Sequence, residues 1–185
     1  MALLHSPAAE NGLIGPDFAL PDLQGDTVTR DGVMGEHGLV VAFICNHCPY
    51  VKAIIDGLVS DAKELQEAGI GVVAIMPNDF RSYPDDAPDK MAAFAKQHGF
   101  TFPYLLDEDQ SVARAYDAVC TPDFFGLDGN GQLAYRGRLD SRRNPNESDR
   151  GQLELRDAML ALGKGENPPE AQMPSMGCSI KWRIS

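Results

Sequence analysis

The chain has 185 residues, 43% of them apolar, which is enough for one domain whose hydrophobic core needs no disulfide staples. Its 16 basic and 27 acidic residues give a net charge of −11, which argues against nucleic acid or an anionic membrane as a partner. The sequence contains neither a signal-peptide pattern nor an apolar run of roughly 18 residues. We therefore expect a soluble cytoplasmic protein whose four cysteines are free thiols or include one working redox pair.

The first strong pattern is a strand–helix–strand unit. Residues 39–44 are apolar without alternation, which predicts a strand that is buried on both faces. Residues 50–68 place their apolar side chains on one face of a helix, and Gly69 ends that helix. Residues 70–76 predict a second buried strand, so the unit has the crossover that parallel strands require.

The remaining elements alternate helices with short strands and include a hairpin with a strong turn signal, Asp-Gly-Asn-Gly. In chain order we expect a turn-rich loop at 77–88, a helix at 89–99, a strand at 102–105, a short helix at 110–116, a hairpin pairing 123–127 with 133–138, and a last helix at 148–162. This succession predicts a four- or five-stranded mixed sheet with helices on both faces.

Cys45 and Cys48 lie where the first buried strand gives way to the helix. Chemistry in α/β sheets gathers at the carboxyl ends of strands, and a helix N-terminus favours an anion. We therefore expect the pKa of the Cys45 thiol to fall below its usual value, and an imidazolium at His47 to lower it further. Cys48 lies one helical turn further on, within reach of Cys45 for a reversible disulfide bond.

A Cys-x-x-Cys pair also occurs as half of a zinc or iron–sulfur site, but Cys120 and Cys178 do not form a second close pair. We therefore expect no metal and no cofactor. Cys120 is either a small buried apolar residue or an auxiliary thiol near the pair. Cys178 either packs against Trp182 or acts as a resolving thiol.

The order strand, Cys-x-x-Cys-Pro, helix, strand, Thr-Pro, hairpin and last helix resembles the thioredoxin fold. The leading segment "GPDFALPDLQGDTVT" resembles the N-terminal extension of its peroxiredoxin-like branch, the alkyl hydroperoxide reductase/thiol-specific antioxidant (AhpC/TSA) family. The motifs "CNHCPYVK", "VCTPDFFGLD", "YRGRLD" and "GCSIKW" together resemble one subgroup of that branch, and the resemblance covers residues 12–182.

The resemblance implies a thioredoxin-like three-layer α/β/α fold with a mixed central sheet. It implies a single domain at 12–182, in which 12–37 form an N-terminal β extension and 164–182 form a C-terminal tail. It further implies that Thr121-Pro122 is a cis-proline loop facing the redox cysteines, with the backbone of Thr121 available to an incoming disulfide partner.

Two departures from related patterns bear on activity. Val41 and Cys45 stand where a peroxiredoxin loop would carry Pro and Thr if Cys48 were the peroxidatic cysteine, which argues against a peroxidase. Asn46 and His47 replace the Gly-Pro of thioredoxin, and a histidine beside the nucleophile is similar to the periplasmic disulfide oxidases.

The predicted function is thiol–disulfide exchange without flavin or metal. Cys45 as thiolate attacks a partner disulfide, and Cys48 then displaces the reduced partner. The partners would be a disulfide-bearing protein or a low-molecular-weight thiol or disulfide, together with an external thiol reductant. One alternative is a thiol-dependent peroxidase whose sulfenic acid is resolved by Cys48, Cys120 or Cys178. The second alternative is a non-enzymatic metal- or partner-binding module on the same fold.

Overall fold

The computed structural model describes residues 2–8, 10–142 and 144–184. The strands are β1 (Leu3–His5), β2 (Ala19–Pro21), β3 (Thr27–Thr29), β4 (Gly38–Phe43), β5 (Ile70–Met76), β6 (Tyr104–Leu106), β7 (Cys120–Thr121), β8 (Asp123–Asp128), β9 (Leu133–Gly137) and β10 (Met176–Ser179). The helices are α1 (Arg30–Val33), α2 (Pro49–Glu67), α3 (Pro88–His98), α4 (Ser111–Ala115) and α5 (Glu154–Gly163), with a 3-10 turn, η1 (Pro84–Asp86).

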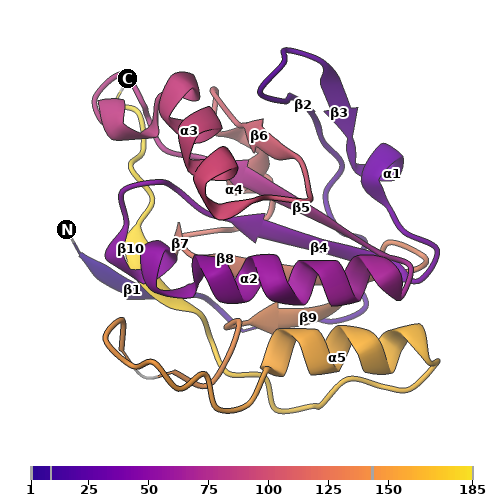
Figure 1. Ribbon diagram of the computed structural model, residues 1–185. Coiled ribbons are helices and arrows are strands. Elements are labelled where there is room, and N and C mark those ends of the chain that lie inside the picture. Colours follow the sequence, from indigo (N-terminus) through magenta and orange to yellow (C-terminus); the bar gives the residue numbers. More distant parts are fainter. Residues whose placement is uncertain (1, 9, 143, 185) are drawn as a thin grey trace.

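The central layer is a mixed arrangement of five strands in the spatial order β6, β5, β4, β8, β9 (Figure 1). β4 pairs antiparallel with β8, and β8 pairs antiparallel with β9, while β5 and β6 pair in parallel. β4 lies beside β5, and just beyond β4 the backbone N–H of Ile44 donates to the carbonyl of Ile75 over 3.0 Å. The predicted mixed sheet is confirmed.

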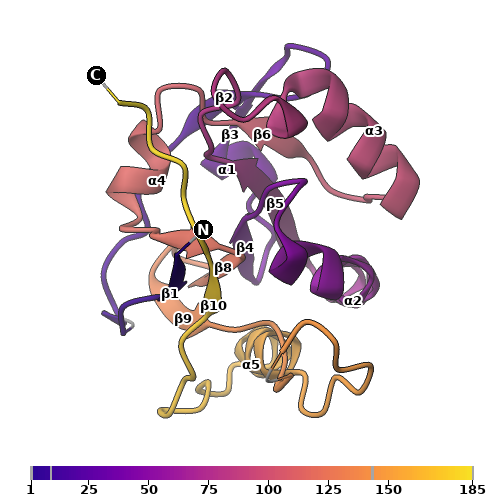
Figure 2. The same ribbon diagram turned by 90° about the vertical axis from the view of Figure 1, so that its left-hand side faces the viewer.

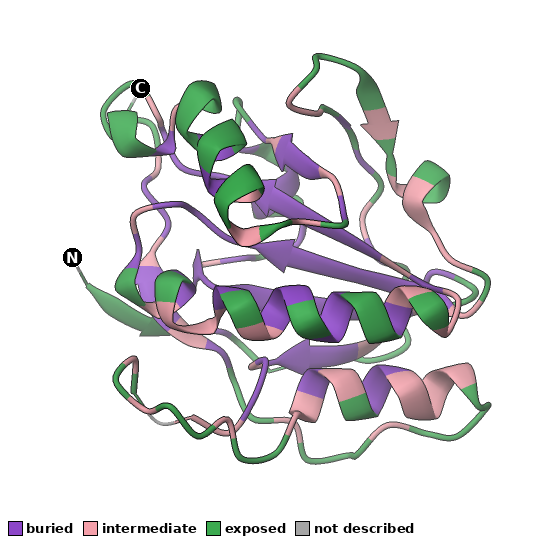
Figure 3. Cartoon of the chain, in the orientation of Figure 1, coloured by how far each residue is buried: buried purple, intermediate pink, exposed green. Residues whose placement is uncertain are grey.

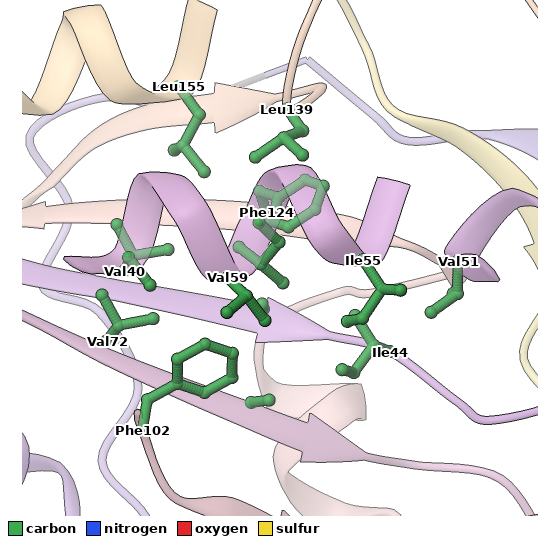
Figure 4. Close-up of a cluster of buried hydrophobic side chains, with 14 of the residues drawn as sticks. Val40, Ile44, Val51, Ile55, Val59, Val72, Phe102, Phe124, Leu139 and Leu155 are labelled. Atoms are coloured by element: carbon green, nitrogen blue, oxygen red, sulfur yellow. The ribbon is translucent and has the colours of Figure 1, made fainter. Parts of the chain in front are cut away.

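Helices cover both faces of this layer. Successive side chains of β4 point to opposite faces and are all apolar, so each face needs a covering layer. Val40, Ala42 and Ile44 belong to the core beneath α2, α3 and α5, part of which is drawn in Figure 4. Leu39, Val41 and Phe43 pack on the other side with residues of α4 and the β2–β3 hairpin. Figure 2 shows the two groups of helices on either side of the strands, and Figure 3 shows β4 buried along its length.

The last helix begins later than its sequence pattern predicts. The expected range was 148–162, whereas α5 runs from Glu154 to Gly163. Gly151 has a positive φ of 59°, which interrupts helical geometry just before α5. The guanidinium of Arg150 binds the carboxylates of Asp61 and Asp140, so this residue serves a tertiary ion pair instead of a helical turn.

The C-terminal tail lies against the redox end of the domain. β10 pairs antiparallel with β1 on one side and with β7 on the other, so Leu3–His5, which precede the predicted domain limits, form the outer strand. Beyond β10, the ring of Trp182 lies 4.3 Å beneath the guanidinium of Arg114. Within the described residues, no helix is both long and apolar enough to cross a lipid bilayer.

Candidate redox site

The Cys-x-x-Cys pair lies in the turn between β4 and α2, as the sequence predicts. β4 ends at Phe43, and Cys48 is the N-cap residue of α2, with Pro49 in the first helical position. Proline suits this position because its fixed φ is helical and its missing N–H would have no partner within the helix. Both thiols are buried, with 1% of Cys45 and none of Cys48 exposed.

Thr121 contacts both thiols. Its side-chain oxygen Oγ1 lies 3.3 Å from the Cys45 sulfur, and its carbonyl oxygen lies 3.2 Å from the Cys48 sulfur. The Thr121–Pro122 peptide bond is cis, which confirms the expectation from the family resemblance. One residue at the end of β7 therefore contacts both thiols of the pair, through its side chain and its carbonyl oxygen.

Contacts from Cys45, from Cys178 in β10 and from the first turn of α2 act on the Cys48 thiol. A hydrogen bond from Cys45 contributes most to lowering the pKa of the Cys48 thiol to about 5, and Cys178 and the backbone N–H of Val51 lower it further, against the effect of burial. These contacts stabilise a thiolate because each places a proton donor against the sulfur. Cys48 is therefore the thiol that ionises first.

The expected lowering of the Cys45 pKa is wrong. The hydrogen bond to Cys48, burial and the nearby negative charge of Asp86 all raise the pKa of the Cys45 thiol well above its usual value. The reason is positional: Cys48 is the N-cap residue of α2, so the backbone N–H of Val51 in the first turn acts on Cys48, whereas among the described residues no backbone donor lowers the pKa of Cys45. Cys45 is therefore the thiol of the pair that keeps its proton.

His47 lies against a buried carboxylate. Its ring nitrogen Nδ1 is 2.7 Å from Oδ2 of Asp86, off the axis of a straight N–H···O bond, and its ring stacks on Tyr83 at 6.0 Å. Asp86 raises the pKa of His47, and burial opposes the shift only in part. The imidazolium that the sequence predicts beside the thiols is thus held by an ion pair with Asp86.

Asp86 is a site residue that the sequence analysis missed. It is fully buried, and its two oxygens accept hydrogen bonds of 2.8 Å from the backbone N–H of Asn46 and from Nδ2 of Asn78. Burial disfavours the charged form of Asp86, but the contacts with His47, Asn78 and Asn46 outweigh it and lower its pKa. The sequence feature that could have indicated Asp86 is its position in the polar loop after β5, because the carboxyl end of β5 lies beside the carboxyl end of β4.

The two remaining cysteines have different surroundings. The thiol of Cys120 is fully buried and lies 3.7 Å from the carbonyl of Pro122, and burial raises its pKa. The sulfur of Cys178 lies 2.9 Å from the sulfur of Cys48, and burial together with the neighbouring Cys48 raises its pKa to about 12. The structure therefore brings Cys178 to the pair, whereas Trp182 packs elsewhere.

One group of side chains near the pair has the composition of a metal site. Cys45, His47 and Asp86 each offer one ligand atom, and these atoms lie within 4.8 Å of one another. Three protein ligands with sulfur, nitrogen and oxygen donors are compatible with a catalytic zinc ion. Both carboxylate oxygens of Asp86 already accept hydrogen bonds, so a metal ion would have to break up the contacts that hold the loop.

A cavity of about 290 Å³ lies beside Pro122 and the first turns of α2, and neither Cys45 nor Cys48 is among the residues that line it. Its walls come from the first turns of α2, from the β8–β9 hairpin and the loop after it, and from the segment that leads into β10. Apolar side chains that line it are those of Tyr50, Ile54, Phe124, Leu139 and Met173. Its lining also includes the imidazole of His5, the guanidinium groups of Arg138 and Arg142 and the carboxylate of Asp140.

Sequence comparison places this chain among oxidoreductases. Residues 12–136 match the family model described as the AhpC/TSA family. The chain is 30% identical over 115 residues to peroxiredoxin Bcp of Escherichia coli K12, a match that covers 62% of this chain and 69% of that protein. It is 28% identical over 123 residues to the thiol-disulfide oxidoreductase YkuV of Bacillus subtilis, covering 63% of this chain and 80% of that protein.

Solved structures extend the similarity to the whole chain. The crystal structure of an uncharacterized conserved protein from Geobacillus kaustophilus superposes with a TM-score of 0.95 at 43% identity, covering 100% of this chain and 98% of that one. The peroxidoxin BcpB of Mycobacterium tuberculosis superposes with a TM-score of 0.63 at 20% identity, covering 85% of this chain and 98% of that one. The second likeness supports the thioredoxin-like fold that the sequence predicts.

Proposed function

This chain belongs to the AhpC/TSA family, and we propose that it is a thiol–disulfide oxidoreductase whose redox pair is Cys45 and Cys48. One observation supports this most strongly: the pKa values of the two adjacent thiols are shifted in opposite directions, so that Cys48 is a thiolate while Cys45 keeps a proton. A nucleophile and a second thiol in one strand-to-helix turn are the parts that disulfide exchange requires. The names of both relatives, peroxiredoxin and thiol-disulfide oxidoreductase, belong to the oxidoreductase class.

The proposed reaction begins at Cys48, in contrast to the order expected from the sequence. The Cys48 thiolate attacks one sulfur of a disulfide R–S–S–R′, forming Cys48–S–S–R and releasing R′–S⁻. The Cys45 thiol then gives its proton to the solvent or to the leaving group and attacks the Cys48 sulfur. This second step forms the Cys45–Cys48 bond and releases the second thiol of the partner. An external thiol reductant regenerates the dithiol by the same steps in reverse.

Thr121 and Pro122 are proposed to position the partner, because the carbonyl of Thr121 already lies 3.2 Å from the Cys48 sulfur. The cavity beside Pro122 offers a largely apolar wall for a side chain of a disulfide-bearing protein or for a low-molecular-weight disulfide. We propose a cytoplasmic location, where an external thiol reductant maintains the dithiol. The net charge of −11 supports neither nucleic acid nor an anionic membrane as a partner.

The direct test is a disulfide reductase assay with three serine variants. Cys48→Ser should abolish attack on the substrate. Cys45→Ser should lose the Cys45–Cys48 bond and turn over more slowly, while still being able to form a mixed disulfide at Cys48. Cys120→Ser is the matched control, because it removes a buried thiol outside the proposed pair, and it should keep its activity. Full activity of folded Cys48→Ser would overturn the proposal.

Peroxide reduction is a second candidate, and the lowered pKa of Cys48 favours it. A thiolate is the form of cysteine that a hydroperoxide oxidises, and the E. coli relative is named a peroxiredoxin. In this case Cys48 would become a sulfenic acid, and Cys45 would attack it and expel water. Trapping of a Cys48 sulfenic acid in Cys45→Ser at low hydroperoxide concentration, together with peroxide turnover by the wild type, would establish this activity.

A further inference from the structure

We propose that Cys178 is a third redox thiol, which closes an alternative disulfide bond with Cys48 and fixes the C-terminal strand β10 over the site. This inference rests on the proposed function, because the same partner disulfide supplies the oxidising equivalents. The protein would then have two competing bridges, Cys45–Cys48 and Cys48–Cys178, which share one sulfur.

The first support is distance. The sulfurs of Cys48 and Cys178 are 2.9 Å apart, about 0.9 Å longer than the S–S bond of a disulfide. Sulfurs this close need only a small side-chain movement to form a bond, whereas Cys120 has its thiol directed at the carbonyl of Pro122. Of the two cysteines outside the pair, Cys178 is therefore the one poised for chemistry.

The second support is how β10 is held. In the antiparallel ladder Cys178 lies opposite Thr121, the same residue whose carbonyl and hydroxyl contact Cys48 and Cys45. A Cβ atom on Gly177 would overlap the carbonyl oxygen of Thr121, so only glycine allows the strand to approach this closely. The close approach of Gly177 and the pairing with Thr121 thus fix the backbone that carries Cys178.

The third support is the anchoring of the chain after β10. The backbone N–H of Ile180 donates to the carbonyl of Val119 over 3.0 Å, and that of Lys181 donates to Oδ1 of Asn78 over 2.9 Å. The amide nitrogen of Asn78 in turn donates to Asp86, the partner of His47. These hydrogen bonds connect the C-terminal tail to Asp86, the carboxylate that raises the pKa values of His47 and Cys45.

The fourth support is the burial of Cys48 on the side of the domain where β10 lies. Cys48 has no exposed surface, and β10 is held between β7 and β1 on this side of the domain. A partner disulfide therefore reaches Cys48 when β10 separates from β7, a local opening of an edge of the fold. A bond between Cys48 and Cys178 would prevent that opening, and a bond between Cys45 and Cys48 would leave the strand free to open.

The partner disulfide R–S–S–R′ is the only oxidant that formation of the Cys48–Cys178 bond requires. Cys48 thiolate attacks R–S–S–R′ and releases R′–S⁻. When β10 returns, Cys178 loses its proton to solvent and its sulfur attacks Cys48, releasing R–S⁻ and forming the Cys48–Cys178 bond. The partner gains two electrons and the protein loses two. In a later exchange Cys45 can attack Cys48, expel Cys178 as a thiol and form the Cys45–Cys48 bond.

The experiment identifies each bridge by non-reducing tryptic mapping after oxidation with oxidised glutathione. Cleavage after Lys and Arg places Cys45 and Cys48 together in peptide 31–52, Cys178 in peptide 165–181 and Cys120 in peptide 115–136. A Cys45–Cys48 bond stays within one peptide, whereas a Cys48–Cys178 bond joins two. Wild type, Cys45→Ala and Cys45→Ala/Cys120→Ser are compared, each checked for native circular dichroism.

We expect both Cys45→Ala proteins to yield the cross-linked peptides 31–52 and 165–181. Cys45→Ala/Cys178→Ser should instead accumulate glutathione on Cys48. Gly177→Ala in the Cys45→Ala background should slow the cross-link by about a hundredfold, since it displaces the strand by roughly an ångström. The Gly177→Ala variant also tests the inference independently of the Cys178 substitution.

The inference fails if Cys45→Ala accumulates glutathione on Cys48 at the same level whether or not Cys178 is present. If the wild type then still forms the bond within peptide 31–52, the proposed function stands without it. If the wild type forms no bond within peptide 31–52 and Cys45→Ala forms no cross-link, both fail. A single measurement on wild type covers the case in which Cys45→Ala does not fold: a cross-link between 31–52 and 165–181 during partial oxidation supports the inference, and its absence at every stage of oxidation contradicts it.

Discussion

Oδ2 of Asp86 lies 2.7 Å from Nδ1 of His47, and the same carboxylate raises the pKa of Cys45. One buried negative charge thus acts on both neighbours: it favours the imidazolium at His47 and disfavours a thiolate at Cys45. This relationship explains why the histidine of the Cys-x-x-Cys motif does not make Cys45 the thiolate, since its positive charge is neutralised by Asp86.

Replacing Asp86 by Asn should lower the pKa of His47, because the carboxylate that raises it is lost. The imidazole resonances of His47, followed by NMR against pH, give this value directly. Asp85→Asn is the matched control, because the side chain of Asp85 is exposed and the bond from Asn46 goes to the backbone carbonyl of Asp85, which the substitution leaves in place. An unchanged His47 titration in Asp86→Asn would contradict the pairing.

The same pair should leave a pH signature in stability. The folded pKa of His47 is raised, so the stabilisation by the imidazolium is complete below the unfolded value of about 6.5 and is lost as pH rises through the folded value. The difference in unfolding free energy between wild type and His47→Gln should therefore shrink as pH is raised from about 6 to 8. Urea unfolding of the reduced proteins at several pH values measures it, and a difference that grows with pH would contradict the ion pair.

Removing His47 should make the Cys45–Cys48 disulfide harder to reduce. His47→Ala leaves Asp86 without its cationic partner, which disfavours a thiolate in the pair and so destabilises the reduced state. The reduction potential should become more negative by something on the order of tens of millivolts, where about 30 mV corresponds to a tenfold change in equilibrium constant. A glutathione titration measures this shift. His98→Ala, which removes a histidine paired with Asp56 on the surface, is the control.

The reduced protein should show one thiolate at a pH where ordinary cysteines are protonated. The pKa of Cys48 is about 5, against roughly 8.5 for a free thiol, so its ultraviolet thiolate absorbance should persist from neutral pH down to about pH 5. Cys48→Ser should lose this signal and Cys120→Ser should keep it. A signal that disappears in Cys45→Ser but persists in Cys48→Ser would restore Cys45 as the nucleophile.

A chelator should change neither the thiol count nor the alkylation rate of Cys48. The reason is that the carboxylate of Asp86 already contacts His47, Asn46 and Asn78, so a chelator would have no bound metal ion to remove. Zinc analysis of the reduced protein before and after dialysis against the chelator provides the measurement. Stoichiometric zinc that is bound by the wild type and lost in Asp86→Asn would favour the metal-binding alternative.

Local patterns were sufficient to predict the position of the redox pair. The change from an unbroken apolar run at 39–44 to a helical period at 50–68 placed Cys45 and Cys48 in the turn between strand and helix. The Asp-Gly-Asn-Gly turn signal placed the β8–β9 hairpin, where the carboxylate of Asp128 accepts bonds from the backbone N–H groups of Asn130 and Gln132. Both features depend on residues that are neighbours in the chain.

The choice of thiolate could not be predicted locally. It depends on where α2 begins, because this puts the backbone N–H of Val51 against Cys48. It also depends on Asp86, which binds the backbone N–H of Asn46 from a position 40 residues later in the chain. The contact between Cys48 and Cys178 spans 130 residues and requires β10 to pair with β7. Periodicity carries no information about such pairings, because short strands can be placed in many registers.

Disulfide exchange by Cys45 and Cys48 is tested by a thiol titration of the wild type across a glutathione redox series. We expect a single two-electron transition in which the four thiols of the reduced chain fall to two, with a bond within peptide 31–52 among the products. Four titratable thiols at every potential, or a transition that is unchanged in folded Cys48→Ser, would contradict it.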